Sequence, residues 1–140
     1  MTDQKVNYEA FFNNFKTAMQ EICDDSFGKG VVTVGFSPAS EQRTDDRIKW
    51  FTVKGNGKEV KFRADAFSSG LAFDLYALMK DGEHIDRLGL RSFDKNLNTI
   101  GVAEIKDAIK RRHATSMGGK RAGQFLPEVA DVVKQRLNLG

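Results

Sequence analysis

Residues 50–63 read WFTVKGNGKEVKFR, which is two β-prone runs on either side of the dipeptide Asn56-Gly57. Asn-Gly tolerates the positive φ angles that both central positions of a type I′ hairpin turn require. Counting outward from this turn gives the cross-strand pairs, which are Val53–Val60 and Phe51–Phe62 on one face, and Lys54–Glu59, Thr52–Lys61 and Trp50–Arg63 on the other. One face is apolar and the other is polar, so the sequence predicts a hairpin with a fixed register.

An amphipathic helix is predicted on the N-terminal side of this hairpin. Asn7 is its expected N-cap, and Asp24-Asp25-Ser26 followed by Gly28 and Gly30 ends it. Its apolar residues recur at three- and four-residue spacing and share one face, namely Tyr8, Phe11, Phe12, Phe15, Met19 and Ile22. We expect this aromatic face to be part of the core, and a partner groove or ligand site is the alternative.

Between this helix and the hairpin, residues 31–36 form a β-branched run in which Val32, Val34 and Phe36 share one face. The polar residues 37–46, with Pro38 near their start, predict an exposed loop.

Four further elements are predicted after the hairpin. A helix begins after Ser68 or Ser69 and stops at Gly82, with an apolar face of Leu71, Ala72, Leu75, Leu78 and Met79. A strand follows over 84–93 and a turn over 94–98. A helix over 101–112 buries Val102, Ile105, Ala108 and Ile109. Pro127 then opens the first turn of a last helix with Val129, Val132, Val133 and Leu137.

The predicted order is therefore α-β-β-β-α-β-α-α. It indicates a single α+β domain over residues 1–140, with an antiparallel sheet of about four strands and helices packed on it. The order of the first five elements resembles that of double-stranded RNA-binding domains, although residues 68–74 here replace the lysine cluster of those domains. It also resembles small secretion chaperones, which are typically acidic. Topology alone assigns no function.

Composition narrows the class of protein. The chain has 140 residues, 40% of them hydrophobic, which is typical of a folded globule. Cys23 is the only cysteine, so an internal disulfide framework and a multi-cysteine zinc site are excluded. The first residues lack the apolar core of a secretory signal, and no run is long enough to span a membrane. We therefore expect a cytoplasmic protein.

Charge is distributed unevenly along the chain. Residues 1–46 carry eight acids and four bases, giving −4, and residues 47–140 carry eighteen bases and eleven acids, giving +7. Residues 110–121, KRRHATSMGGKR, hold five cations and no acid. Three of these cations complement the carboxyl end of the helix dipole, which is a purely structural role. Lys120 and Arg121 follow Gly118-Gly119, and the helix dipole does not account for them. The sequence therefore predicts that this segment binds phosphate oxygens.

The polar face of the hairpin provides a second candidate surface. Trp50, Lys61 and Arg63 combine an aromatic ring with cations, as in proteins that bind single-stranded nucleic acid. Trp50 and Arg63 can instead satisfy each other as a cation–π pair. Lys54 and Glu59 would then be an ordinary cross-strand ion pair.

The residues that would carry enzyme chemistry are sparse. His84 and His113 are the only histidines and lack ligand-like spacing, so no histidine-rich metal site is predicted. Cys23 has no partnering histidine in the sequence and is expected to be a buried, inert thiol. Lys120 follows two glycines but lacks the other residues of a phosphate-binding loop. We expect a protein that is not an enzyme and uses no cofactor or metal.

The sequence thus predicts a small nucleic-acid-binding domain that contacts phosphates. Its candidate binding residues are Lys110, Arg111, Arg112, Lys120 and Arg121, with Trp50, Lys61 and Arg63 as a secondary surface. The alternative is a protein-interaction module, such as an adaptor, chaperone or inhibitor. It would use the apolar face of the first or last helix to form a homodimer or to hold a protein client.

Overall fold

The structure is a computed structural model that describes residues 7–42, 44–66, 73–78, 85–90, 97–110 and 129–139. In residues 73–78 and 85–90 it describes the course of the backbone alone. The helices and strands are α1 Tyr8–Phe27, β1 Thr33–Phe36, β2 Ile48–Gly55, β3 Lys58–Ala66, β4 Phe73–Leu78, β5 Ile85–Leu90, α2 Val102–Lys110 and α3 Val129–Leu137. Two short 3-10 turns, η1 Ala39–Glu41 and η2 Leu97–Thr99, lie between them.

Helix α1 begins and ends where the sequence predicts. The side-chain oxygen of Asn7 accepts a hydrogen bond from the Ala10 N–H at 3.0 Å, which satisfies one of the free amides of the first turn. Gly28 follows the last turn with a φ of 96°, a conformation that favours glycine. The buried residues of α1 are Phe11, Phe12, Phe15, Ala18, Met19, Ile22 and Cys23. The aromatic face is therefore core, as expected.

The central hairpin has the predicted register at all five pairs. The turn residues adopt positive φ angles, 54° at Asn56 and 71° at Gly57, as a type I′ turn requires. The Asn56 side chain also donates hydrogen bonds to the backbone carbonyls of Leu137 and Asn138, both at 3.0 Å. The turn is thereby joined to the end of α3, some eighty residues later in the chain.

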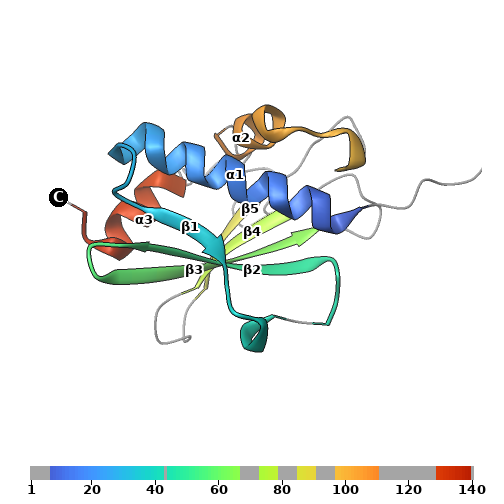
Figure 1. Cartoon of the computed structure of the whole chain (residues 1–140), viewed down its shortest axis with the longest axis horizontal. Coiled ribbons are helices and arrows are strands. Elements are labelled where there is room, and N and C mark those ends of the chain that lie inside the picture. The colour runs from blue at the N-terminus through green and yellow to red at the C-terminus, as the bar shows by residue number, and fades with distance from the viewer. Residues whose placement is uncertain are drawn as a thin grey trace, which may run out of the picture.

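The strands form one antiparallel sheet in the order β1-β2-β3-β4-β5. Helices α1 and α3 cover one face of this sheet, and α2 packs against α1 (Figure 1). The inner face of strands β1 to β3 is formed by Val34, Phe51, Val53, Val60, Phe62, Ala64 and Ala66, all of them buried. Burial of one such large side chain contributes about 1.5–3 kcal/mol, so this layer is the main source of stability.

Strand β1 lies at one edge of the sheet, and a side chain of α1 covers part of that edge. The Gln20 amide oxygen accepts a hydrogen bond from the Val34 N–H at 2.8 Å, and its nitrogen donates to the Val32 carbonyl at 2.9 Å. The amide therefore binds the strand backbone much as a neighbouring strand would. This contact fixes the position of α1 along the sheet edge.

The helix predicted from Ser68 or Ser69 to Gly82 is wrong at its centre, because residues 73–78 form strand β4. These residues fit both periods: Leu71, Leu75 and Leu78 are spaced as in a helix, while Phe73, Leu75 and Ala77 alternate as in a strand. The backbone groups along the edge of β3 need partners, and β4 supplies them over six residue pairs. Tertiary pairing thus overrode the helical pattern. Residues 68–72 and 79–82 lie outside the described residues.

The α+β class is confirmed, with an N-terminal helix, an antiparallel sheet and short helices after it. The sheet has five strands in place of about four, because β4 occupies the place of the predicted second helix. The resemblance in element order to double-stranded RNA-binding domains therefore ends at the fifth element. The strand predicted over 84–93 corresponds to β5, and the last two predicted helices correspond to α2 and α3, with Pro127 outside the described residues.

Candidate nucleic-acid interface

The basic segment, residues 110–121, starts at the last residue of α2. Lys110 is the last residue of that helix, and only its backbone is described. Arg111, Arg112, Lys120 and Arg121 lie outside the described residues. The structure therefore fixes where the segment starts and leaves its contacts as predictions.

The direction of α2 is set by contacts with α1. Near the start of α2, the Asn14 side chain donates to the Ile100 carbonyl at 3.5 Å. Further along, the Lys106 ammonium lies 2.6 Å from Asp25 and 3.5 Å from Glu21. The hydrogen bond with Asp25, aided by these charges, raises the pKa of Lys106. The two helices therefore pack against each other (Figure 1), and Lys110 follows one turn after the lysine that pairs with Asp25 in the last turn of α1.

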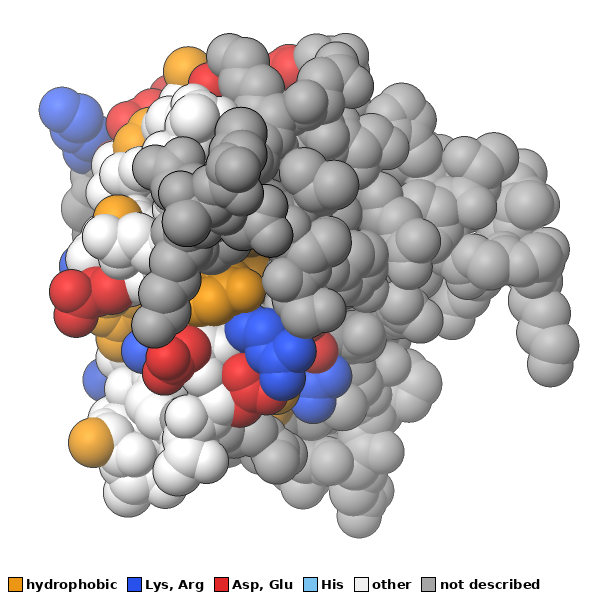
Figure 2. Space-filling view, turned by 90° about the vertical axis from the view of Figure 1, so that its right-hand side faces the viewer, with side chains coloured by type: hydrophobic (Ala, Val, Ile, Leu, Met, Phe, Trp, Pro, Cys, Tyr) orange, Lys and Arg blue, Asp and Glu red, His pale blue; other side chains and the backbone are white. Residues whose placement is uncertain are grey.

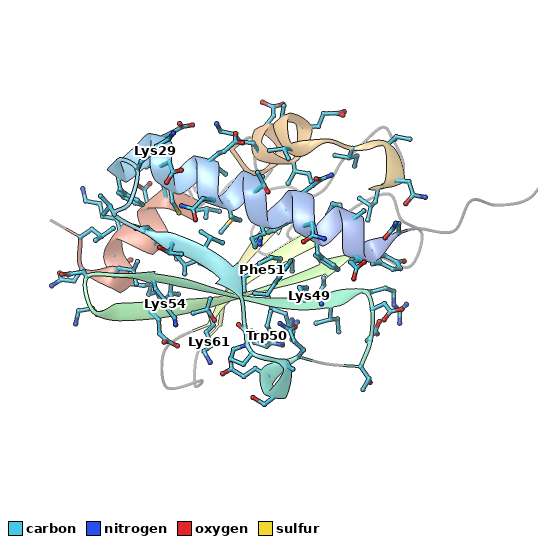
Figure 3. All side chains as sticks on the ribbon, viewed as in Figure 1. Lys29, Lys49, Trp50, Phe51, Lys54 and Lys61 are labelled. Atoms are coloured by element: carbon cyan, nitrogen blue, oxygen red, sulfur yellow. The ribbon has the colours of Figure 1, made fainter. Side chains whose placement is uncertain are left out.

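The secondary surface lies on the outer face of the sheet, away from the helices. Figure 3 shows Trp50, Lys54 and Lys61 on this side. The Arg63 guanidinium carbon lies 6.0 Å from the centre of the Trp50 ring, so the cation–π alternative of the sequence analysis is present. Arg63 also forms a two-point ion pair with Asp65, at 2.9 and 3.0 Å. The charge of Arg63 is thus balanced by an acid of the same strand.

Lys61 is neutralised in a similar way. Its ammonium contacts the Glu41 carboxylate and lies 4.0 Å from a Glu59 oxygen. The expected Lys54–Glu59 pair has the predicted register, while the ion pair that Glu59 makes in the described structure is with Lys61. Sequence reasoning missed Glu41, because it comes from η1 and no local pattern places that turn beside β3.

A glutamine holds the η1 segment on the outer face. The Gln42 side-chain nitrogen donates to the Ser37 and Trp50 carbonyls, at 2.9 and 3.0 Å. Its oxygen accepts from the Trp50 N–H at 3.0 Å. Beneath it, the buried Ser37 and Thr52 hydroxyls bond each other at 2.7 Å. The loop predicted over 37–46 is therefore anchored to β2 through both Gln42 and Ser37.

An open pocket of approximately 340 Å³ lies between η1 and the outer face of the hairpin. Its lining includes Glu41, Lys54, Glu59 and Lys61, which is two acids and two bases. Basic and acidic side chains also lie next to one another on the described part of the face shown in Figure 2. A surface of balanced charge attracts a polyanion weakly, so Lys61 and Arg63 support phosphate binding less than the sequence suggested.

A second cluster, which sequence reasoning missed, lies at the edge strand. Phe36 shares its face with Val32 and Val34, as predicted, but it is 39% exposed at the end of β1. The ammonium groups of Lys16 and Lys49 lie over its ring, at 4.9 and 5.6 Å from the ring centre. The period-two pattern of β2 could have placed Lys49 on this face. Lys16 arrives only because α1 packs on the sheet.

The single thiol has the inert environment that the sequence predicts. Cys23 is fully buried in α1, and burial, with a smaller contribution from the Asp24 charge, raises its pKa to about 12. Only the thiolate is nucleophilic, and almost none is present at neutral pH in the folded protein. Cys23 therefore acts as a small core residue.

No protein-family model, curated protein sequence or solved structure matches this chain. None of the helices in the described segments combines the length and the apolar character needed to cross a lipid bilayer. The case for a function therefore rests on the residues themselves.

Proposed function

We propose that this protein is a small, non-enzymatic nucleic-acid-binding domain that contacts phosphates through residues 110–121. The observation that carries the proposal is the presence of five cations and no acid in that segment. Closely spaced cations with glycines between them suit phosphate oxygens better than they suit any neutral ligand. The contacting residues are Lys110, Arg111, Arg112, Lys120 and Arg121.

The charge arrangement of the described residues supports this assignment by contrast. Lys106, one turn before the segment, already pairs with Asp25 and Glu21 across to α1. On the sheet, Lys61 and Arg63 already pair with acids. The segment 110–121 contains no acid of its own, so its charge must be balanced by another part of the chain or by a partner, and we propose a nucleic-acid partner.

Trp50, Lys61 and Arg63 have a lesser role in this proposal. Their cations would have to leave Glu41 and Asp65 to reach phosphates, which cancels much of the gain. The surface would therefore add little to the salt dependence of binding.

We favour this proposal over the alternative, a protein-interaction module that uses an apolar helix face. The apolar faces of α1 and α3 both belong to the core, where the α3 residues are Val129, Val132, Val133 and Leu137. Neither face is available to a homodimer partner or a client while the domain is folded.

A salt titration of binding tests the proposal. The K120A/R121A variant should bind DNA or RNA more weakly and similarly across sequences, because phosphates are common to all of them. For duplex DNA, the slope of log affinity against log salt should become shallower by about two units. Fluorescence anisotropy at several salt concentrations measures both, and urea unfolding should change by less than about 0.5 kcal/mol.

The matched control is K54A/K58A, which removes the same charge from two exposed positions of the hairpin. An equal loss of slope in this control would mean that binding follows net charge and not the segment. Absence of measurable binding of the wild-type protein to DNA and RNA at low salt would refute the proposed function.

A further inference from the structure

Phe36 is one of two large hydrophobic residues that are exposed in the described part of the chain. Its ring rests against the fully buried Phe51, with ring centres 5.3 Å apart and planes at 40°. Phe51 in turn contacts Phe15 of α1 at 5.3 Å. The exposed ring is thus supported from behind by rigid core, which fixes its orientation without the help of a ligand.

Two cations, Lys16 and Lys49, meet at this ring. In the described segments, neither the Lys16 nor the Lys49 ammonium lies within 4.0 Å of a carboxylate oxygen. Each ammonium is attracted to the negative face of the ring, so two positive charges gather at one exposed aromatic side chain. The site therefore combines an aromatic surface with positive charge that an anion could neutralise.

We infer that Phe36, together with Lys16 and Lys49, is a stacking site for one base of a single-stranded nucleic acid whose neighbouring phosphates pair with the two lysines. This inference rests on the proposed function, and it adds the form of nucleic acid and the place where a base is held.

The energies favour the exchange that such binding requires. Each lysine is held only weakly over an exposed ring, whereas a base stacks on an aromatic side chain more strongly than a single lysine does. The base replaces the ammonium groups on the ring, and the ammonium groups move to phosphates with release of counterions. Long lysine side chains allow this movement without any change in the backbone.

The ring selects for a single strand because the base faces of a duplex are already stacked and paired. An acidic peptide could supply the negative charge. It does not carry a flat aromatic base next to each charged group, so it would not stack on the ring in the same way. Lys16 lies about 16 Å along α1 from the carboxyl end of that helix, near which the basic segment begins. A polyanion a few nucleotides long covers such a distance.

The test compares two variants of Phe36 with two probes. The probes are a short fluorescein-labelled oligothymidylate and a DNA duplex of the same length. F36L keeps apolar volume but loses the ring, and it should weaken oligothymidylate binding by about 5- to 150-fold with little effect on the duplex. F36W should retain binding, because indole also stacks on bases. V31A is the matched control, since Val31 is the other exposed hydrophobic residue, at 44%.

Charge variants test the phosphate contacts separately. K16Q/K49Q should lower the salt slope for oligothymidylate by about 0.7 units for each lysine, the value for a phosphate contact with a single strand. An unchanged slope would show that these lysines do not reach phosphates and would overturn their part in the inference.

The remaining outcomes are distinguishable. Wild-type binding that F36L leaves unchanged overturns the inference alone and leaves the proposed function in place. A loss in W50L without a loss in F36L moves the stacking site to the outer face. Polyglutamate binding that F36L abolishes, with oligothymidylate binding intact, replaces the inference with an acidic peptide. Failure of the wild-type protein to bind either nucleic acid overturns both proposals.

Discussion

The two faces of the β2–β3 hairpin are built from alternate residues of the same strands, yet they carry opposite chemistry. Phe51 and Phe62 face the helices and are fully buried. Their chain neighbours Trp50, Lys61 and Arg63 face outward, partly exposed and engaged in ion pairs or ring contacts. The inner face provides stability by burial, and the outer face contributes little because water already satisfies its charges.

The charged groups at the edge of the sheet differ from those at its centre. On the outer face, Lys61 and Arg63 have acids beside them, contributed by η1 and by β3 itself. At Phe36, two lysines from α1 and β2 share a ring, with no acid within ion-pair distance in the described segments. The comparison teaches that aromatic–cation proximity alone is a weak sign of function, and that the missing counter-charge is the informative part.

The largest expected effect breaks the inner face. F51A should lower the free energy of unfolding by about 3–5 kcal/mol, because it leaves a cavity among Phe12, Phe15 and Phe36. W50A, one residue earlier on the opposite face, should cost about 1 kcal/mol. Urea unfolding monitored by circular dichroism compares the two variants. Equal losses would show that the two faces do not differ in their contribution to stability.

An effect of intermediate size is expected from the buried thiol of Cys23, which should make the stability of the protein depend on pH. The pKa of Cys23 rises from 9.0 to about 12 on folding, so between these values the unfolded chain loses a proton that the folded chain keeps. The contribution of this thiol is complete below pH 9 and is lost as pH rises, by up to about 1.4 kcal/mol for each pH unit. Unfolding in urea at pH 8, 10 and 11 measures the loss.

The C23A variant supplies the control for this pH dependence, because lysines and tyrosine also titrate above pH 9. The stability difference between wild type and C23A should shrink steadily over the window. A difference that stays constant with pH would mean that the folded protein does not hold the thiol proton, and that this part of the interior admits water.

The smallest expected effect concerns the outer face. E41Q removes the closer of the two acids beside Lys61, and the side chains of Lys61 and Glu41 are both about one-third exposed. The loss should be below about 1 kcal/mol at low salt and should shrink further in high salt, since surface ion pairs are screened. A double-mutant cycle of E41Q with K61Q isolates the pair energy. A coupling above about 2 kcal/mol, insensitive to salt, would place this pair among the structural supports of the fold.

Local patterns predicted those parts of the fold that local physics determines. The Asn56-Gly57 turn sets the hairpin register within its own fourteen-residue stretch, and Asn7 and Gly28 mark the ends of α1. Residues 73–78 satisfied both a helical and a strand pattern, and only the unpaired edge of β3 resolved the choice. When a segment fits both a helical and a strand period, its secondary structure depends on the element that it packs or pairs with.

The candidate sites divide in the same way. The Trp50–Arg63 contact follows from the register, so the sequence predicted it. The partner of Lys61 and the contacts of Lys16 and Lys49 with Phe36 join residues thirteen or more positions apart through helix–sheet packing and a loop. No periodicity reports such contacts. The role of residues 110–121 stays a prediction, because four of the five cations lie outside the described residues.

The Gln20 amide on β1 has a consequence for how molecules of this protein behave in crowded solution. An open sheet edge is a template on which a strand from another molecule can be added, and repeated addition produces fibrils. Here the Val34 N–H and the Val32 carbonyl are already occupied by a group tethered to the same chain. Because the glutamine belongs to the same chain, its effective concentration at the edge is constant. A strand from another molecule must compete with it, and this competition becomes weaker as the protein is diluted. One glutamine on a helix thus protects this sheet edge against polymerisation of the protein.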